Sequence, residues 1–598
     1  MQSPLRWQRT RCALPLLFSL FTILNSQWPV VPGISSACQA EHPRPQLSAD
    51  KLFDPAHLVN VEIELSRDDW NTLRHQTRAL ALSLGKTPAA RPFRYFPGNV
   101  TVDGVLIRNV GIRKKGFLGS LSQSRPSLKI KFGEFQQQQP IAGLDRLTLN
   151  NNRQDRSLAS QYLCYRFFNE TGTVACRCNH AKVTVNGEYL GIYSHVEAIK
   201  APFLENRFDD ASGDLYEGTV ADLWPDSFQR FELKTRQSSH APLAQLADLL
   251  AQEQLDLQAI GKLLDVPAFV KFWATESLLG FWDGYTNNQN NFFVYRKPAN
   301  SKLYFLPWGV DCAFTNAMPL PPFIIRPKSV YCRSLLANRL YRLPAIQQQY
   351  RETLLSLLQD HWQESQWNAE IDRLETHLEN NLHHSQRDFS RNLQRVRQFV
   401  IGRRKVIQKE LAEWPLEIAK GPREPLYFKP LGQATATFST QWYAQEPEDP
   451  LHTGQLELNL SIDGQAVQFK DRQLGIHARL GDRDFSGNRP ATLVITGKRA
   501  SDDKQITLAA GLPVTEFRPA TGNRSLVQGY YVAGSTQGLL ALFFRPQTET
   551  LAGHIQLEQA STEVGAPVSG TIELQILKMA GGKVRKFAHD LLLRRTKE

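Results

Sequence analysis

The stretch FWDGYTNNQNNFFVYRK crowds carboxylate and amide side chains into one short loop. Asp283 is followed by Asn288, Asn290 and Asn291, and the apolar residues FFVY that come next are typical of a β-strand. A turn requires only one or two such polar residues, so this loop carries more of them than turn chemistry explains. A second strand-like segment, LYFLP, is followed closely by Asp311 in WGVDCAF. The sequence therefore places carboxylates and amides at the ends of two neighbouring strands.

This combination suits magnesium-dependent phosphoryl transfer. Mg²⁺ takes oxygen ligands and usually only one or two carboxylates, so amide oxygens can complete its shell. In protein kinases one aspartate positions the attacking hydroxyl, an asparagine five residues later binds magnesium, and a second aspartate holds magnesium against the phosphates. Asp283 and Asn288 have that five-residue offset, and Asp311 follows the second strand of a pair. The alternative is an asparagine-rich turn after a helix, with Asp311 as an ordinary strand-end residue.

Basic residues upstream of this loop could hold phosphates. The segment GIRKKGFLGSLSQ has spaced small residues and leads directly into RPSLKIKF, which carries Lys129 and Lys131. A flexible backbone loop beside a strand lysine can bind phosphate, with the lysine acting as a compact charge. The two lysines are two residues apart and so point to the same face of a strand. A solvated strand edge would give the same pattern, so both interpretations stay open.

Strands and helices alternate around these residues. Period-two alternation predicts strands at 58–66 and within 94–132, and Ser66 with Asp69 has capping-box spacing for a helix between them. Asn186-Gly187 predicts a hairpin turn in AKVTVNGEYLGIYSHVEAI. The other predicted elements are a strand at 144–150, a helix from Asp155 to Gly172, and helical segments at 241–282 and 333–413.

From about residue 426 onward, short strands separated by turns replace the helices. These segments are LELNLSIDG, ATLVITG, GYYVAG, GLLALFFRP, GHIQLEQ and GTIELQIL. They are typical of an all-β sandwich, and GPREP supplies Pro and Gly where a linker would precede it. We therefore predict an α+β chain with a catalytic domain at 41–420 and an all-β, sandwich-like accessory domain at 421–598.

The N-terminus is typical of a signal peptide. MQSPLRWQRTR is basic, CALPLLFSLFTIL is an apolar run, and SSACQA offers small residues for cleavage near Ala37 or Ala40. The apolar run is too short to span a bilayer comfortably, although an uncleaved anchor is the alternative. We predict a signal peptide at 1–40 and an exported protein, whether secreted, periplasmic or at the cell surface. The mature chain is expected to have no membrane span.

Charge and motifs narrow the function further. The chain has 70 Lys and Arg against 58 Asp and Glu, which gives a net charge of +12. The basic residues are scattered, without runs or interleaved aromatics, so we expect no nucleic-acid partner. No G-x-S-x-G, H-E-x-x-H or Walker loop occurs, so hydrolase and P-loop functions lack support. The seven cysteines are too few for a disulfide framework, and their pairing is left open.

The motifs also resemble those of a known protein family. GIRKKG, RPSLKIKF, LTLNNNRQDRSLASQYL, EYLGIYSHVEAI, GDLYEG, WDGYTNNQNNFFVY and LYFLPWGVDCAF occur in the order of the CotH family, so the region 58–410 resembles these spore-coat-type kinases. The resemblance implies an atypical protein-kinase-like fold that uses ATP and Mg²⁺ or Mn²⁺ to phosphorylate protein serines. It also implies that Asp283 is the catalytic aspartate, that Asp311 and Asn288 bind the metal, and that Glu197 lies where a hinge-like strand would meet adenine.

Two departures from the family pattern affect this interpretation. The motif WGVD has Gly309 where the family usually has an acid, as in WDLD, which would weaken metal binding or mark a degenerate enzyme. A helix glutamate that would pair with the phosphate lysine is not apparent, since the corresponding helix offers Asp155 and Gln161. Of the two candidate lysines, Lys131 is slightly preferred over Lys129.

Three functions follow from these observations. The leading hypothesis is an exported CotH-type kinase that acts on a secreted or cell-surface protein. The second is an inactive relative that serves in surface assembly or adhesion through its β-domain. The third is the same fold transferring a nucleotide instead of a phosphate. The retained Asp283 and Asp311 favour an enzyme, whereas Gly309 favours the inactive relative. The substrate and the oligomeric state are not encoded in any motif.

Overall fold

The computed structural model describes residues 47–580 apart from 77, 79–83, 86, 89–92, 118, 236–237, 319–324, 426, 484–488, 520–521, 527 and 534–548. The predicted signal peptide at 1–40 and the predicted strand GLLALFFRP both lie outside the described residues. Within the described part, none of the helices combines the length and apolar character needed to cross a membrane.

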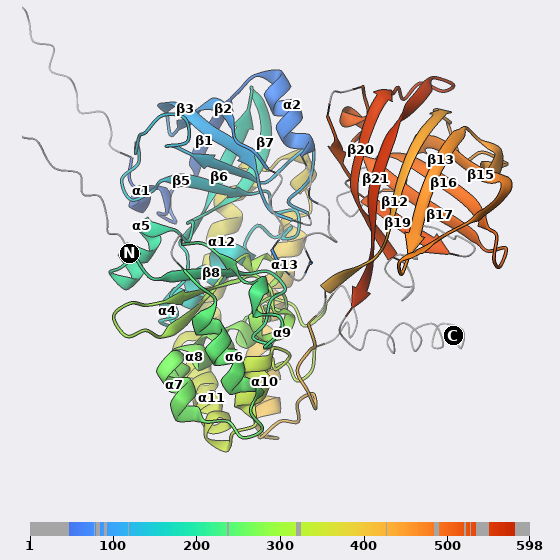
Figure 1. Ribbon diagram of the computed structural model, residues 1–598. Helices are drawn as coiled ribbons and strands as arrows, with labels where there is room; N and C mark the ends of the chain where they lie inside the picture. Colours follow the sequence, from blue (N-terminus) through green and yellow to red (C-terminus); the bar gives the residue numbers. More distant parts are fainter. Residues whose placement is uncertain are drawn as a thin grey trace, which may run out of the picture. The chain divides into compact units, whose positions relative to one another are not determined.

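The first region is a closed β-barrel with the strand order β1-β2-β3-β4-β5-β7-β6 (Figure 1). Its strands are β1 (Val59–Glu64), β2 (Phe96–Val102), β3 (Val105–Lys114), β4 (Leu128–Lys131), β5 (Arg146–Asn150), β6 (Cys178–Val185) and β7 (Glu188–Val196). The pairs are antiparallel except for β1 and β6, whose parallel pairing closes the barrel. Alternate residues of β1 face the barrel core, as the period-two pattern predicts.

Local turn and cap chemistry behaves as the sequence predicts in this region. The tight turn between β6 and β7 places Asn186 and Gly187 at φ +49° and +82°, which is the backbone that this dipeptide favours. Helix α2 (Arg67–His75) begins after Ser66, whose hydroxyl accepts a hydrogen bond from the Asp69 N–H at 3.0 Å. These two predictions are confirmed.

The second region combines a small sheet with helices. The sheet has the order β11-β10-β8-β9, and its strands are β8 (Asp214–Gly218), β9 (Glu232–Leu233), β10 (Phe292–Arg296) and β11 (Leu303–Pro307). The helices of this region and of the barrel's flank are α1 (Ala49–Leu52), α4 (Ser160–Glu170), α5 (Ala201–Phe208), α6 (Ala241–Ala251), α7 (Leu257–Leu263), α8 (Val266–Leu278), α9 (Tyr285–Asn288), α10 (Leu335–Tyr341), α11 (Pro344–Ser356), α12 (Glu364–Leu378) and α13 (Phe389–Leu411).

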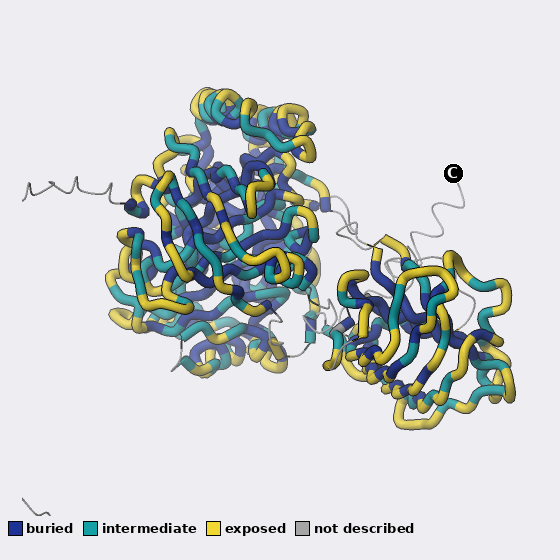
Figure 2. Tube along the Cα trace, turned by 90° about the horizontal axis from the view of Figure 1, so that it is seen from above, coloured by how far each residue is buried: buried dark blue, intermediate teal, exposed yellow. Residues whose placement is uncertain are grey.

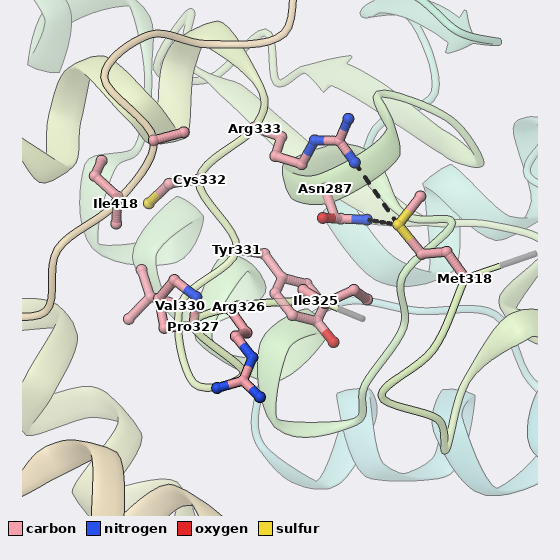
Figure 3. A pocket seen from close by; sticks show the side chains of 11 residues that line it. Asn287, Met318, Ile325, Arg326, Pro327, Val330, Tyr331, Cys332, Arg333 and Ile418 are labelled. Carbon is pink, nitrogen blue, oxygen red and sulfur yellow. Dashed lines mark hydrogen bonds between the residues drawn. The ribbon is translucent and has the colours of Figure 1, made fainter. Parts of the chain in front are cut away.

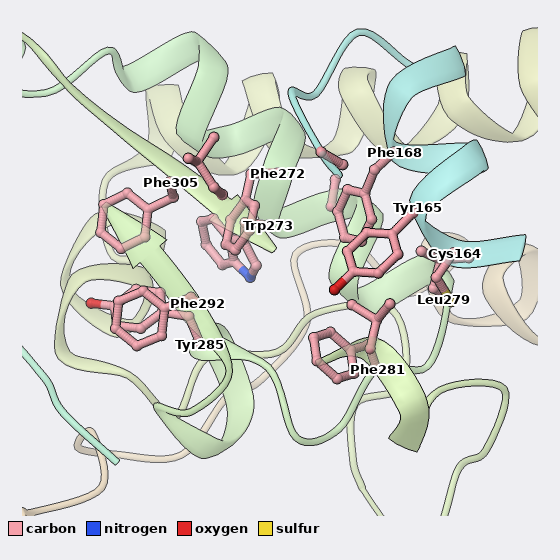
Figure 4. Close-up of a cluster of buried hydrophobic side chains, with 14 of the residues drawn as sticks. Cys164, Tyr165, Phe168, Phe272, Trp273, Leu279, Phe281, Tyr285, Phe292 and Phe305 are labelled. Atoms are coloured by element: carbon pink, nitrogen blue, oxygen red, sulfur yellow. The ribbon is translucent and has the colours of Figure 1, made fainter. Parts of the chain in front are cut away.

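An aromatic core joins α4, α8 and the β10–β11 hairpin (Figure 4). The Tyr285 ring lies 4.5 Å from Phe292 and 4.8 Å from Phe305, measured between ring centroids. Large aromatic side chains bury much apolar surface and pack in fixed geometries, so such a cluster is rigid. Because Tyr285 lies two residues after Asp283, the aromatic core supports the loop that carries this aspartate.

Helix α4 begins later than the sequence predicts. The predicted start at Asp155 is instead a capping turn, because the Asp155 carboxylate accepts hydrogen bonds from the N–H groups of Ser157 at 3.1 Å and Ser160 at 2.7 Å. The helix proper starts at Ser160 and ends at Glu170, close to the predicted end at Gly172. A buried aspartate that satisfies helix N–H groups is a cap rather than a helical residue.

The C-terminal region from Tyr427 onward is all-β, as predicted. Its strands are β12 (Tyr427–Gln441), β13 (Gln455–Ile462), β14 (Gln465–Ala466), β15 (Phe469–Leu480), β16 (Ala491–Arg499), β17 (Gln505–Leu512), β18 (Arg524–Ser525), β19 (Gln528–Ala533), β20 (Glu549–Gln559) and β21 (Pro567–Ala580). They form one ten-stranded sheet with the order β14-β13-β12-β21-β20-β19-β17-β16-β15, and β18 pairs with β20 beside this path.

This continuous sheet differs from the two packed sheets of the predicted sandwich. The Thr440 hydroxyl at the end of β12 donates to the Ile476 carbonyl of β15 at 2.7 Å, so the sheet curls until these strands meet. Gly553 and Gly570 permit the bend, since a Cβ at either position would lie within 2.1 Å of a carbonyl oxygen of the paired strand. The buried residues then line one interior, as Figure 2 shows for this region.

The described cysteines are free thiols. Cys164, Cys176, Cys178 and Cys332 are buried, and Cys312 is half-buried. Burial raises the pKa of each of these thiols well above its usual value, so they are neutral at physiological pH. The described part of the chain therefore has no disulfide, although the export prediction would permit one.

Candidate active site

The loop that carries Asp283 lies between α8 and β10. The Asp265 side chain caps α8 by accepting a hydrogen bond from the Ala268 N–H at 3.1 Å. After the helix, Gly280 at φ +63° turns the chain, and Gln289 and Asn291 adopt positive φ values of 55° and 52°. Left-handed backbone at non-glycine residues is uncommon, and it lets this loop double back on Asp283.

Three asparagine side chains converge on the Asp283 carboxylate. The Nδ2 groups of Asn288 and Asn290 donate to Oδ1 at 2.5 and 3.2 Å, and that of Asn291 donates to Oδ2 at 2.8 Å. Burial raises the pKa of Asp283, and these amide hydrogen bonds oppose the rise. The crowd of asparagines therefore fixes the orientation of one aspartate, which explains why the loop exceeds the needs of a turn.

Two further buried carboxylates hold this loop, Glu276 through its backbone and Asp222 through its side chains. Glu276 accepts hydrogen bonds from the N–H groups of Tyr285 at 3.0 Å and Thr286 at 2.9 Å, and from the Thr286 hydroxyl at 2.6 Å. Asp222 accepts from the Tyr285 hydroxyl at 2.9 Å and from Gln289 Nε2 at 2.8 Å. Buried, fully bonded acids of this kind specify a single loop conformation.

Glu276 gives the protein a measurable pH dependence of stability. Burial raises its pKa from a usual value near 4.5 to about 7, so the folded state favours the protonated carboxyl. The stabilisation is complete below about pH 4.5 and disappears as the pH rises through about 7, a change of about 3 kcal/mol. We expect wild type to lose about 3 kcal/mol more than Glu276→Gln between pH 5 and pH 8 in chemical denaturation.

Asp311 does not affect this comparison. It is present in both chains, so its contribution to the pH dependence of the unfolding free energy cancels. Glu276→Gln replaces one acceptor by a donor, so a uniform loss of stability at every pH is also expected. Identical slopes of unfolding free energy against pH for the two chains would show that Glu276 is ionised throughout.

Asp311 lies in a short 3₁₀ turn after the β10–β11 hairpin. Burial, together with the negative charges of Asp283 and Asp155, raises its pKa to about 7, and the positive charge of Lys115 opposes the rise. The structure thus brings the two predicted aspartates within electrostatic range of each other, together with Asp155, which the sequence offered only as a helix residue. Adjacent acids with raised pKa values are a feature of functional sites.

Gly309, the departure from the family pattern, is required by the local backbone. Its φ of +53° lies in the left-handed region, and a Cβ there would lie 2.9 Å from Asn291 Oδ1. Its N–H donates to the Tyr165 hydroxyl at 2.9 Å. A side chain at this position would push against an asparagine that holds Asp283, so the missing acid follows from how this loop is packed.

Restoring the family acid is therefore expected to be harmful. Gly309→Asp should lower the unfolding free energy by about 1 kcal/mol or more through backbone strain, without strengthening Mg²⁺ binding. Gly309→Ala is the matched control, since it adds the same strain without a charge. Calorimetric titration with Mg²⁺ and thermal melting measure both effects. Tighter metal binding by Gly309→Asp than by Gly309→Ala would show that the lost carboxylate matters.

The two predicted phosphate lysines share one face of β4, as expected, but their surroundings differ. Lys131 Nζ forms an ion pair with Glu134 at 2.7 Å. Lys129 lies between the positive charges of Arg113, Lys115 and Arg146 and the acid Glu217 of β8, and burial lowers its pKa well below the usual value. Lys131 is thus already paired in this structure, whereas the slight preference for it as the phosphate lysine stays a prediction.

A third lysine, Lys115, lies within electrostatic range of Asp311 and was not among the predicted site residues. Lys115 Nζ donates to Asn150 Oδ1, and Asn150 Nδ2 donates to Gln161 Oε1 at 2.6 Å. Lys115 also lies over the Trp308 ring, 6.0 Å from its centroid. This series of hydrogen bonds connects the residue after β3, the end of β5 and helix α4. The signal was present in GIRKKG and LTLNNN, but neither motif shows which partners meet.

Glu197 does not face a ligand with its carboxylate. It is buried, and its oxygens accept hydrogen bonds from Arg177 N at 3.0 Å, Nε at 3.1 Å and Nη2 at 2.6 Å. Its own N–H donates to the Arg177 carbonyl at 2.9 Å. A carboxylate with this many donors acts as a structural ion pair, so the geometry gives no support to an adenine contact through this side chain.

Arg423 reaches the loop that carries Asp283 from beyond the predicted domain boundary at residue 420. Its Nη1 donates to Asn288 Oδ1 at 2.5 Å, its Nη2 to the Asn288 carbonyl at 2.6 Å, and its Nε to Gln289 Oε1 at 2.6 Å. Gln289 Nε2 returns a hydrogen bond to the Arg423 carbonyl at 3.0 Å. Burial lowers the pKa of Arg423 to about 10, so it stays charged. No sequence motif pointed to this contact.

Asp311 and Asn291 carry oxygen atoms of the kind that Mg²⁺ binds. The described residues contain no group of three His, Cys, Asp or Glu side chains that could hold a metal unaided. Mg²⁺ needs only one or two protein carboxylates when phosphates and water supply the rest. Asn288 Oδ1, the predicted ligand, accepts from Arg423. Asn291 Oδ1 lies against Gly309, two residues before Asp311, and receives no hydrogen bond from the described residues.

A family model matches the middle part of this chain. Residues 112–407 match the family model described as CotH kinase protein. The chain is similar to Spore coat protein homolog 1 of Rhizopus delemar, with 25% identity over 241 residues, or 37% of this chain and 39% of that protein. It is also similar to Inner spore coat protein H of Bacillus subtilis, with 23% identity over 194 residues, or 30% of this chain and 53% of that protein.

The aligned parts thus span about two fifths and about half of the lengths of these relatives. The matched segment contains Asp283, Asp311 and Lys115 but ends before Arg423. Residues 112–407 thus correspond to a CotH-family domain.

Proposed function

We propose that this chain is an exported kinase that transfers the γ-phosphate of ATP to a serine or similar hydroxyl of a secreted or cell-surface protein. The observation that carries the proposal is that Asp283, held by three amides, lies within electrostatic range of Asp311 in the turn after the neighbouring hairpin. The description of the matching family as a kinase and the spore coat names of both relatives add support for the activity and the surface location.

The barrel and the helical region support a kinase-like fold for this site. Protein kinases pair a strand lysine with a glutamate of the following helix. Here the strand before α4 ends in Asn150, and its side chain binds Gln161 of that helix. Lys115 donates to Asn150 from the adjoining part of the barrel. An amide pair thus replaces the ion pair, and the positive charge comes from Lys115, with Lys129 as a second cation.

Asp283 would orient the acceptor hydroxyl and take up its proton. Its carboxylate is fixed by the amides of Asn288, Asn290 and Asn291, so little reorganisation is needed when the hydroxyl arrives. Burial makes this carboxylate a better proton acceptor by raising its pKa. Lys115 would balance negative charge at the phosphates, close to Asp311.

Mg²⁺ or Mn²⁺ would be held by Asp311 together with an asparagine oxygen. Asn291 Oδ1 is better placed than Asn288 Oδ1, because the latter already accepts a hydrogen bond from a guanidinium. Such a cation neutralises charge on the β- and γ-phosphates during transfer. Asp311 would bind it in the deprotonated form, which the nearby positive charge of Lys115 favours.

Incubation of the purified mature chain with ATP and a generic protein acceptor tests this function. The ATP is labelled in the γ-phosphate in one sample and in the α-phosphate in another. Transfer of the γ label alone supports a kinase, and transfer of the α label identifies a nucleotide transferase. Transfer of neither label, by a chain that melts cooperatively, identifies the inactive, surface-assembly relative.

A further inference from the structure

A small pocket adjoins the catalytic loop on the side of the segment that follows Asp311 (Figure 3). Its volume is about 50 Å³, and its walls include Asn287, Met318, Ile325, Tyr331 and Arg333. Nucleotides and drug-sized molecules occupy sites of about 300 Å³ or more. A cavity of this size admits the end of one side chain, so its ligand would be part of a larger molecule.

Arg333 brings an uncompensated positive charge into this pocket. Its only side-chain hydrogen bond with a described residue runs from Nη1 to Met318 Sδ at 3.7 Å, a contact drawn in Figure 3. Thioether sulfur is a weak acceptor. Burial lowers the pKa of Arg333, and within the described residues no carboxylate pairs with it. The nearby Arg423 adds positive charge. A half-buried guanidinium without an anion favours an anionic ligand.

Asn287 supplies a second unpartnered group. Its Nδ2 donates to the Trp282 carbonyl at 2.7 Å, which fixes the orientation of the amide. Its Oδ1 is buried and accepts no hydrogen bond from the described residues. A peptide N–H is a suitable donor for such an oxygen. The pocket therefore offers a cation for an anionic side chain and an acceptor for a backbone group.

The same contacts place the pocket beside the proposed chemistry. The Trp282 carbonyl that binds Asn287 belongs to the residue directly before Asp283. The apolar lining from Met318, Ile325 and Val330 suits the methylene stem of a peptide side chain. We propose that this pocket binds an anionic side chain, aspartate, glutamate or phosphoserine, that flanks the modified hydroxyl in the acceptor polypeptide. The proposal rests on the proposed kinase function for what the bound polypeptide undergoes.

Fluorescently labelled peptides test the pocket by binding as well as by turnover. The first peptide carries aspartates on both sides of a serine, the second carries asparagines, and the third carries phosphoserine in place of the aspartates. Wild type is expected to bind and phosphorylate the acidic peptides about tenfold better than the asparagine peptide. The difference between the aspartate and phosphoserine peptides identifies which anion fits.

Two variants assign the preference to Arg333. Arg333→Gln should bring the ratio of the acidic to the neutral peptide close to one. Met318→Glu places a carboxylate of the protein itself beside Arg333 Nη1 and should also remove the preference for acidic peptides. This variant gains an ion pair, so it is expected to fold. Arg395→Gln, which removes an exposed arginine of α13, is the matched control and should keep the wild-type ratio.

The outcomes separate the pocket from the kinase activity. If fluorescence anisotropy shows tighter binding of the acidic peptides but no phosphate is transferred, the result supports the pocket and counts against the kinase. Transfer with equal binding of all three peptides by wild type would overturn the pocket and leave the kinase intact. An unchanged preference in both Arg333→Gln and Met318→Glu would also overturn it.

Discussion

Asp311→Asn is expected to lower the rate of ATP-dependent transfer by about a hundredfold or more while the chain still folds. Asp311 lies within electrostatic range of Lys115, and its charge would be needed to hold a divalent cation at the phosphates. Asparagine has the same shape but lacks that charge. Burial already raises the pKa of Asp311 to about 7, so its neutral form is compatible with the fold.

Asp283→Ala should give an equally large loss of transfer with a different binding profile. Asp283 would orient the hydroxyl, so this variant should keep most of its affinity for Mg²⁺-ATP, whereas Asp311→Ala should lose both binding and transfer. Calorimetric titration with ATP and Mg²⁺ distinguishes them. Asp248→Asn, an exposed acid on α6, serves as the control. Equal loss of nucleotide affinity in the Asp283 and Asp311 variants would mean that the two roles are wrongly assigned.

The second large effect concerns Arg423. Arg423→Gln in the full chain is expected to lower transfer about tenfold to a hundredfold, because the loop containing Asn288 and Gln289 loses three charge-assisted hydrogen bonds. The unfolding free energy should fall by about 2 kcal/mol, since Gln289 Oε1 loses its partner. Lys420→Gln, an exposed cation of the same segment, should change neither property.

The same contact changes where the chain can be divided. A chain ending at residue 420, the predicted boundary, lacks Arg423, whereas one ending at 425 keeps it and stops before β12. We propose that the catalytic part extends to about residue 425 and that the β-rich remainder affects partner choice or attachment. The longer truncated chain should retain transfer to a generic substrate and the shorter one should lose most of it. Equal activity of the two would show that Arg423 is dispensable.

The positions of Asp283 and Asp311 could be predicted because each is tied to a neighbouring strand. The apolar runs of β10 and β11 mark these two strands: Asp311 lies four residues after β11, and Asp283 lies in the segment between α8 and β10. The role of the asparagines was harder to predict, since an amide offers both a donor and an acceptor. The sequence suggested metal-binding oxygens, but the structure uses the nitrogens to hold Asp283.

Lys115 and Arg423 could not be identified because their partners are distant in the sequence. Lys115 meets Asn150 through the side-by-side packing of the barrel, and Arg423 meets Asn288 across more than a hundred residues. Likewise, β12, β15 and β17 were not among the predicted strands, and the one-sheet arrangement depends on close approaches at Gly553 and Gly570. Periodicity reports which face of a strand is buried but not which strand lies beside it.

The parallel pair that closes the barrel limits the order in which the chain can fold. Val59 of β1 pairs with Ala181 of β6, so the barrel cannot close until more than a hundred further residues have emerged. Until then, the β6-facing edge of β1 has no partner, and such an edge can pair with other chains. Pairings this far apart also slow folding. In a chain that crosses a membrane from its N-terminus, this edge would therefore stay unpaired during translocation. A chaperone that covers β1 at this stage would prevent it from pairing with other chains.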